Sequence, residues 1–316
     1  MSPPLAARVL ASVRGRPAGD SRGKLRPLTA LLRLAAFVLL AAVVAIVLYV
    51  RQQRVRALEH DRAALLQAMR NQGSALTRSD RELPGKVTAA VAMHAVPAYA
   101  GDWLPDELRN ERRLTELLAL PTLYLRGPLD VLSRAGGVAQ AALGSWRDAF
   151  VLCLLDPPPA RSESALKAKA RAALARGSEM QAAAHFERLE PLLQALPLLG
   201  PDWQQRVKAA ETPRALDGYR KLFEVAPIQA AVRAAKARQL LLVVDEPGDT
   251  KAPAELDGER PHAVRVIVTD LASDQLQLRF RHDVDPTWLS QAARAEYASG
   301  IDSCALALDL RAALGR

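Results

Sequence analysis

The chain has 316 residues and a formal net charge of +9, because its 43 Lys and Arg residues outnumber its 34 Asp and Glu residues. This excess lies wholly in residues 1–75, which hold 12 basic and 3 acidic residues, whereas residues 76–316 hold 31 of each. A nucleic-acid-binding domain would carry its basic surface on the folded part, with aromatic side chains on which bases stack. Only 4% of the chain is aromatic, so the composition gives no support to nucleic-acid binding.

Residues 1–28 are basic and contain several Pro and Gly residues, which predicts a flexible tail. Seventeen consecutive apolar residues, 34–50, then lie between Arg33 and Arg51. A helix of this length spans roughly 25 Å, and residues 29–32 extend it toward the roughly 30 Å of a bilayer core. A helix of a soluble core would rarely have Arg at both ends. We therefore predict a membrane-spanning helix over 29–50, with lipid contacts that include the flanking Arg and Lys side chains.

This helix is expected to stay attached as an anchor. A cleavable signal has a shorter apolar core, followed closely by a small-residue cleavage site, and the nearest such pattern here lies far away, at residues 98–100. Six Lys and Arg residues occur within the twenty residues before the apolar run and five within the twenty after it. The positive-inside rule then predicts a bacterial inner-membrane protein with a cytoplasmic N-terminus and an extracytoplasmic C-terminal domain. The opposite orientation is the alternative.

Residues 51–75 lack Pro and contain no Gly before Gly73, which predicts a helical stalk. Val55, Leu58, Leu65 and Met69 occupy a and d positions of two heptads, although Arg62 occupies the a position between them. Either the stalk self-associates or binds protein partners through this seam as a short coiled coil, or it lies alone on the membrane surface.

Residues 76–316 are expected to form a helix-rich mixed α/β (α+β) domain, either as one body or as two subdomains that meet near 200–225. A helix capped by Asp102 is expected to reach Leu120, and residues 123–125 are expected to form a strand. The apolar runs 150–155 and 240–244 each precede an Asp and a Pro, which favours two buried strands and raises the hypothesis of an internal repeat.

Further helices are expected over 163–176, 178–195, 201–210, 213–223 and 227–238. Apolar residues alternate with polar ones over 264–268 and 276–280, which predicts a β-hairpin whose Arg-bearing face is solvated. Residues 286–297 and a segment ending near Leu314 are predicted to form the last two helices.

The two cysteines, Cys153 and Cys304, both lie in apolar runs. Burial as small apolar side chains is the preferred interpretation. A disulfide between them, which would require an oxidising compartment, and a catalytic thiol are the alternatives.

Motifs for catalysis are incomplete. Ser164 and Lys167 match the S-x-x-K pattern of penicillin-binding enzymes, but the accompanying Ser-Asp-Asn and Lys-Thr-Gly motifs are missing. His282 is followed by Asp283 and Asp285, yet alternation along a strand would direct the imidazole away from both carboxylates. No metal site and no cofactor are predicted. Asp156, Asp245 and His282 remain candidates for binding a ligand.

The layout resembles that of single-span assembly factors of bacterial envelopes, in organisation only. The sequence therefore predicts a membrane-anchored scaffold or protein-interaction component. The alternative is a membrane-anchored sensor or enzyme that binds a small ligand in residues 76–316.

Overall fold

The computed structural model describes residues 26–145, 149–175, 185–248, 261–285, 288–290 and 301–315. The chain divides into two units, residues 1–60 and residues 61–316. The long N-terminal helix α1, Arg26–Gly73, contains the apolar run. In the described part of the chain, α1 is the one helix that is long and apolar enough to cross a membrane, and its most apolar window is fully exposed. The expected single candidate transmembrane helix near the N-terminus is therefore confirmed.

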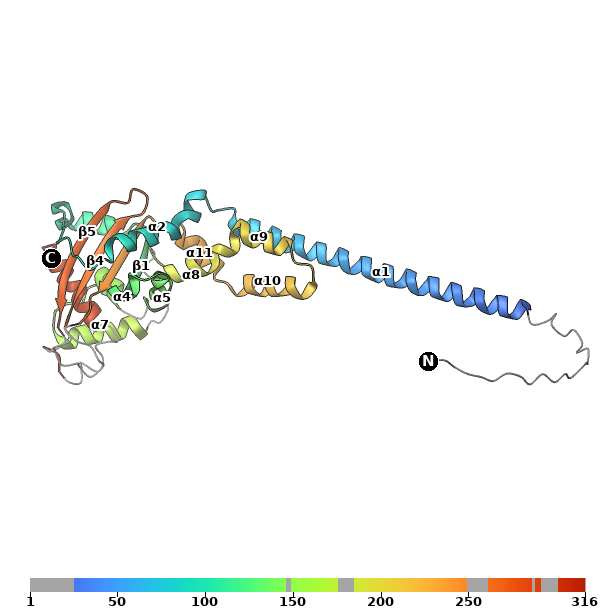
Figure 1. Ribbon diagram of the computed structural model, residues 1–316. Coiled ribbons are helices and arrows are strands. Elements are labelled where there is room, and N and C mark those ends of the chain that lie inside the picture. The colour runs from blue at the N-terminus through green and yellow to red at the C-terminus, as the bar shows by residue number, and fades with distance from the viewer. Residues whose placement is uncertain are drawn as a thin grey trace, which may run out of the picture. The chain divides into compact units, whose positions relative to one another are not determined.

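A five-stranded mixed sheet forms the centre of the second unit (Figure 1). Its strand order is β2-β1-β3-β4-β5; β2, β1 and β3 run parallel, while β4 and β5 are antiparallel to their neighbours. The strand bounds are Thr122–Pro128 for β1, Phe186–Arg188 for β2, Gln239–Asp245 for β3, His262–Asp270 for β4 and Leu276–Val284 for β5.

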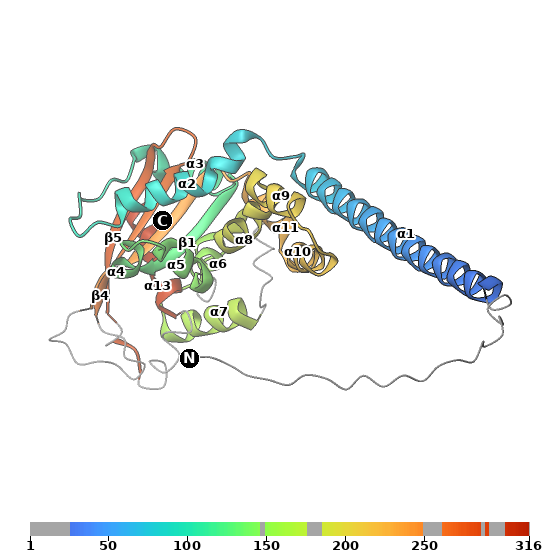
Figure 2. The same ribbon diagram turned by 45° about the vertical axis from the view of Figure 1, so that its right-hand side comes forward.

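Alternate residues of the strands enter two separate cores, as strand geometry requires. One core lies between the sheet and three helices: α6 (Phe150–Leu155), α7 (Glu163–Ala175) and α13 (Ile301–Ala313). The strands contribute Tyr124, Leu241 and Val243 to it. Leu123 and Leu242 face the opposite group. That group comprises α2 (Arg78–His94), α4 (Leu129–Leu132), α5 (Gly137–Gly144), α8 (Leu189–Ala195) and α11 (Ile228–Ala234), as Figures 1 and 2 show. The expected α+β class is confirmed.

The residues of α1 that follow position 60 belong to the folded unit. The Arg62 guanidinium donates to the Ala210 carbonyl at 2.6 Å, and Leu65 and Met69 are buried. Ala210 lies between α9, Pro201–Lys208, and α10, Pro213–Val225, which Figure 2 shows as neighbouring helices. The unit boundary at 60/61 therefore falls inside the segment expected to be a stalk.

Residues 150–155 form the helix α6 and not the strand that the sequence predicted. Four of its six residues, Phe150, Val151, Cys153 and Leu154, are almost completely buried. A short helix enclosed on most sides has no polar face, so its sequence is as uniformly apolar as that of a buried strand. Since 240–244 lies in the strand β3, the two runs are not a structural repeat.

Two expected helices also differ from the prediction. The segment after Asp102 contains the 3₁₀ turn η1, Asp106–Arg109, and the helix α3, Glu111–Leu118, whose cap is Asn110. Residues 178–184 lie outside the described residues, and the rest of the expected helix over 178–195 is divided between β2 and α8. Pairing of Phe186–Arg188 with β1 overrides the helical propensity of this segment.

The predicted strand at 123–125, the hairpin of β4 and β5, and the last helix are confirmed. The helices α7, α9, α10 and α11 agree with the prediction to within a few residues. Most of the helix expected over 286–297 lies outside the described residues. A second 3₁₀ turn, Leu196–Leu199, follows α8.

Gly137 provides a test of how closely α4 and α5 are joined. A Cβ atom at this position would lie 1.8 Å from the Val131 carbonyl oxygen, whereas a Cβ atom at Gly144 would meet nothing within 4 Å. Gly137→Ala is therefore expected to lower the free energy of unfolding by about 1–3 kcal/mol, the usual cost of overpacking. Gly144→Ala is the matched control on the same helix and should leave stability unchanged or slightly higher. Urea unfolding of the detergent-solubilised protein, followed by tryptophan fluorescence, measures both; equal losses would contradict the close approach.

Candidate functional site

A buried ionic cluster lies at the carboxyl ends of β1 and β3. Because these strands are parallel, Arg126 of β1 and Asp245 of β3 reach the same edge of the sheet. The Arg126 guanidinium donates from Nε to Asp245 Oδ2 at 3.0 Å and from Nη2 to Asp245 Oδ1 at 2.7 Å. The same guanidinium donates to Asp302 Oδ2 at 3.0 Å and to the Ser303 hydroxyl at 2.7 Å. One cation thus joins two strands to the first turn of α13.

The charges of this cluster are mostly shielded from water. The side chains of Arg126 and Asp302 are each 13% exposed and that of Asp245 is 21% exposed. Burial by itself would raise the pKa of Asp245, but the charge of Arg126 and the hydrogen bonds from His262 and Arg126 lower it to about 2. Asp245 is therefore ionised at neutral pH, and two carboxylates share one guanidinium.

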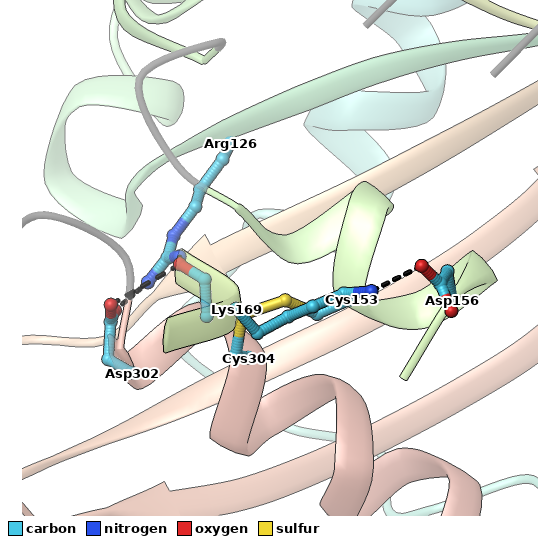
Figure 3. The surroundings of a disulfide bond; sticks show 7 residues. Arg126, Cys153, Asp156, Lys169, Asp302 and Cys304 are labelled. Carbon is cyan, nitrogen blue, oxygen red and sulfur yellow. Dashed lines mark hydrogen bonds and ion pairs between the residues drawn. A yellow bond between two sulfur atoms is a disulfide. The ribbon is translucent and has the colours of Figure 1, made fainter. Parts of the chain in front are cut away.

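A disulfide between Cys153 of α6 and Cys304 of α13 lies next to the ionic cluster. Both residues are fully buried, and the pair spans a sequence separation of 151 residues. Figure 3 shows Arg126 and Asp302 close to this bond. Since Asp302, Ser303 and Cys304 are consecutive, the start of α13 is fixed by ionic, hydrogen-bonded and covalent contacts at once.

The three residues that the sequence marked as ligand candidates are not brought together. Asp245 belongs to the ionic cluster. The Asp156 carboxylate, which is 77% exposed, pairs with Lys169 of α7. His282 of β5 lies with its Nε2 atom 2.9 Å from Asp309 Oδ2 of α13, and Arg161 contacts both Asp309 oxygens, each at 2.9 Å.

A small cleft lies between the His282–Asp309 pair and the ionic cluster. His282 and Asp309 line it together with Asp302 of the ionic cluster, and its volume is about 20 Å³. This volume suffices for one water molecule, since a buried water needs about 10–15 Å³, and is far below the roughly 300–1,000 Å³ of small-molecule sites. Among the described residues, no group of three or more His, Cys, Asp and Glu side chains has the arrangement of a metal site.

A second charged cluster, which the sequence did not reveal, covers the face of the β4–β5 hairpin that lies opposite His282. The guanidinium carbons of Arg265, Arg279 and Arg281 lie 5.3, 5.8 and 6.0 Å from the centre of the Tyr99 ring. Glu246 accepts from Arg265 and, at 3.0 Å, from Arg281, and this pairing lowers the pKa of Glu246. Burial and a hydrogen bond to Asp102 raise the pKa of Tyr99.

The expectation that this Arg-bearing face is solvated was therefore wrong for Arg265, whereas the side chain of Arg281 on the same face is 38% exposed. The side chain of Arg265 is only 3% exposed, because it donates to the carbonyls of Val96 and Pro97, while Arg279 donates to those of Gly101 and Ala100. Residues 96–103 thus lie across the hairpin. Arg residues at alternating strand positions were the available signal, but the sequence did not show that carbonyl groups distant in the chain would satisfy them.

No protein-family model, curated protein or solved structure matches this chain. The contacts described above are consequently the basis for any assignment of function.

Asp245→Asn tests the ionic cluster. The substitution replaces one of the two carboxylates that neutralise Arg126 with a neutral amide, so we expect the free energy of unfolding at pH 6 to fall by about 2–3 kcal/mol. The folded-state pKa of Asp245, about 2, lies below its ordinary value of 3.8. The ionised carboxylate therefore stabilises the fold above that ordinary value, and this contribution is lost as the pH falls toward about 2. The difference between wild type and variant should shrink by about 2 kcal/mol over this range.

Urea unfolding at a series of pH values from 6 to 2 measures this difference. Asp130→Asn is the control, because Asp130 pairs with Arg134 on the surface, with side chains 57% and 70% exposed. It should change stability by less than about 1 kcal/mol. A constant difference between wild type and Asp245→Asn at every pH would contradict the assignment of the ionised form.

Proposed function

We propose that this protein is a membrane-anchored interaction component of a bacterial cell envelope. In this proposal α1 is a retained single-span anchor in the inner membrane, and residues 61–316 lie on the extracytoplasmic side, where they bind other envelope proteins. The basic residues that flank the apolar run, such as Arg33 and Arg51, contact anionic headgroups. The buried disulfide supports this orientation, because disulfides persist in oxidising compartments and are rare in the cytosol.

The observation that carries the interaction role is the outward face of α10. Ala215, Gly218, Leu222 and Val225 are all exposed, and their spacing of three, four and three residues places them on one helix face. Leu222 is 52% and Val225 80% exposed. The other face of α10 is already used, since Leu216 is buried and the Tyr219 ring packs edge-on against Trp203 at 5.3 Å. A stripe with this heptad spacing fits the apolar face of a partner helix.

The candidate ligand residues support the same choice over a sensor or an enzyme. Asp156, Asp245 and His282 each pair with a residue on another element, so each of these side chains has its partner within the protein itself. The cleft beside His282 has the volume of one water molecule. A membrane-anchored sensor or enzyme for a small ligand would need more space than this cleft offers.

Topology has its own prediction. A reporter enzyme that is active only outside the cytoplasm, fused after Arg316, should be active, and a reporter that works only inside the cytoplasm should be inactive at the same position. In the same cells, alkylation of unfolded protein should detect no free thiol at Cys153 or Cys304, because the outer compartment is oxidising. The opposite reporter pattern would reverse the orientation.

Partner binding is tested with the full-length protein. After mild solubilisation, the wild type should co-purify in stable proportion with one or a few other envelope proteins, and Leu222→Asp should reduce their yield several-fold. Leu143→Asp is the matched control, since Leu143 of α5 is similarly exposed, at 57%, and lies outside the α10 stripe; it should retain the partners. His282→Gln should also retain them. A lone protein in several mild detergents, or equal loss in all three variants, would contradict the proposal.

A further inference from the structure

His262, the first residue of β4, lies beside the ionic cluster at the carboxyl ends of β1 and β3. Its side chain is 9% exposed, and its Nε2 atom lies 3.6 Å from Oδ1 of Asp245. The same oxygen accepts a hydrogen bond from the Arg126 guanidinium. The imidazole therefore faces a carboxylate that is already paired with one cation.

The cluster that His262 adjoins carries more negative than positive charge among its described members. Asp245 comes from β3 and Asp302 from α13, while Arg126 of β1 is the cation between them. Two carboxylates against one guanidinium leave one negative charge in excess. An uncompensated charge that is mostly shielded from water is costly, so this position favours a second cation.

The neighbouring strand β5 does not supply this cation. His262 lies opposite Val284 of β5. The ionisable side chains on either side of Val284 are paired elsewhere or exposed: His282 with Asp309, Asp283 with Arg281 on the other face of the hairpin, and the exposed Asp285. In the described part of the chain, the imidazole of His262 is thus the group placed to balance the cluster.

Two effects act on this imidazole in opposite directions. Burial by itself disfavours its charged form, whereas opposite charges within about 4–6 Å favour that form. The pKa of Asp245 reflects the same attraction, because the charge of Arg126 and then the hydrogen bond and charge of His262 lower it against the effect of burial. The excess of carboxylate around His262 decides the balance in favour of the proton.

We propose that His262 takes up a proton in the folded protein and is the pH-dependent second cation of the ionic cluster. The charged imidazole shares Asp245, which leaves Arg126 to hold Asp302 and Ser303 at the start of α13. As the pH rises above neutrality the imidazole loses its proton, and the hold on the first turn of α13 loosens. The disulfide through Cys304 keeps α13 attached, so the change is local and reversible.

A histidine NMR titration of the full-length protein in mild detergent tests the protonation directly. The resonance that is missing from His262→Gln belongs to His262, and in the wild type it should titrate above the ordinary pKa of about 6.5. In Asp245→Asn, which removes the excess carboxylate, the same resonance should titrate at lower pH, while that of the exposed His60 should not move. A pKa of His262 at or below 6.5 in the wild type would overturn the proposal without any variant.

The pH dependence of stability provides a second test with a defined sign. A group whose pKa is raised by folding stabilises the fold below its unfolded value, and this contribution is lost as the pH rises through its folded value. The stability of the wild type relative to His262→Gln, measured by urea unfolding, should therefore fall between about pH 6 and pH 9. A difference that stays constant over this range would contradict the proposal.

His94 is the matched control, because its response has the opposite sign. Burial and the charge of Arg279 lower the pKa of His94, so its neutral form stabilises the fold above the unfolded value and this contribution is lost in acid. The wild type should therefore gain stability relative to His94→Gln as the pH rises from about 5 to 7.

Hydrogen exchange shows where the structure responds. After correction for the intrinsic effect of pH, the amides of residues 302–306 should exchange several-fold faster at about pH 8.5 than at about pH 6.5 in the wild type. In His262→Gln the two rates should be equal, and the amides of α11 should be unaffected in both proteins. Equal protection of residues 302–306 at both pH values in the wild type would overturn the link to α13.

Discussion

The fold of residues 61–316 depends on neutralising the charge of Arg126, whose side chain is mostly shielded from water. Arg126 projects from a strand whose neighbours Tyr124 and Leu125 are fully buried, and an isolated guanidinium there would be costly. Asp245 and Asp302 compensate it from two other elements. Once this cation is satisfied, β1, β3 and α13 have defined positions, and α6 and α7 complete the core around α13. The disulfide then secures an arrangement that the charges have already specified.

The sequence predicted the elements whose pattern is local. Alternation of Val264, Val266 and Val268 with other residues indicated β4, and the apolar run after Arg33 indicated the long apolar helix α1. Prediction failed where distant contacts decide the outcome. Residues 150–155 are helical because the core encloses them, and Phe186 joins a strand because β1 offers a free edge. Neither cause is present in the neighbouring residues.

The ionic cluster was predictable only in part, because its contacts also join residues that are distant in the chain. The sequence marked Asp245 only as a candidate for binding a ligand, whereas in the structure its carboxylate pairs with Arg126. Its partner Arg126 is 119 residues away in the chain, and Asp302 is 176 residues from Arg126. A single sequence does not connect such positions. Arg126 had a weak signal of its own, a charge at an alternating position of an otherwise apolar strand, and this signal acquires meaning only when β3 is placed beside β1.

The long separation of Cys153 and Cys304 in the chain affects how the protein can be made. Under the proposed orientation the polypeptide crosses the membrane with its N-terminal end fixed, so Cys153 emerges long before Cys304, which follows 151 residues later. The face of the sheet that α6 and α7 cover remains incomplete until α13 arrives. Such dominance of distant pairings slows folding and leaves apolar surface exposed in the meantime. Biogenesis would therefore depend on an oxidant that acts after Cys304 has crossed the membrane.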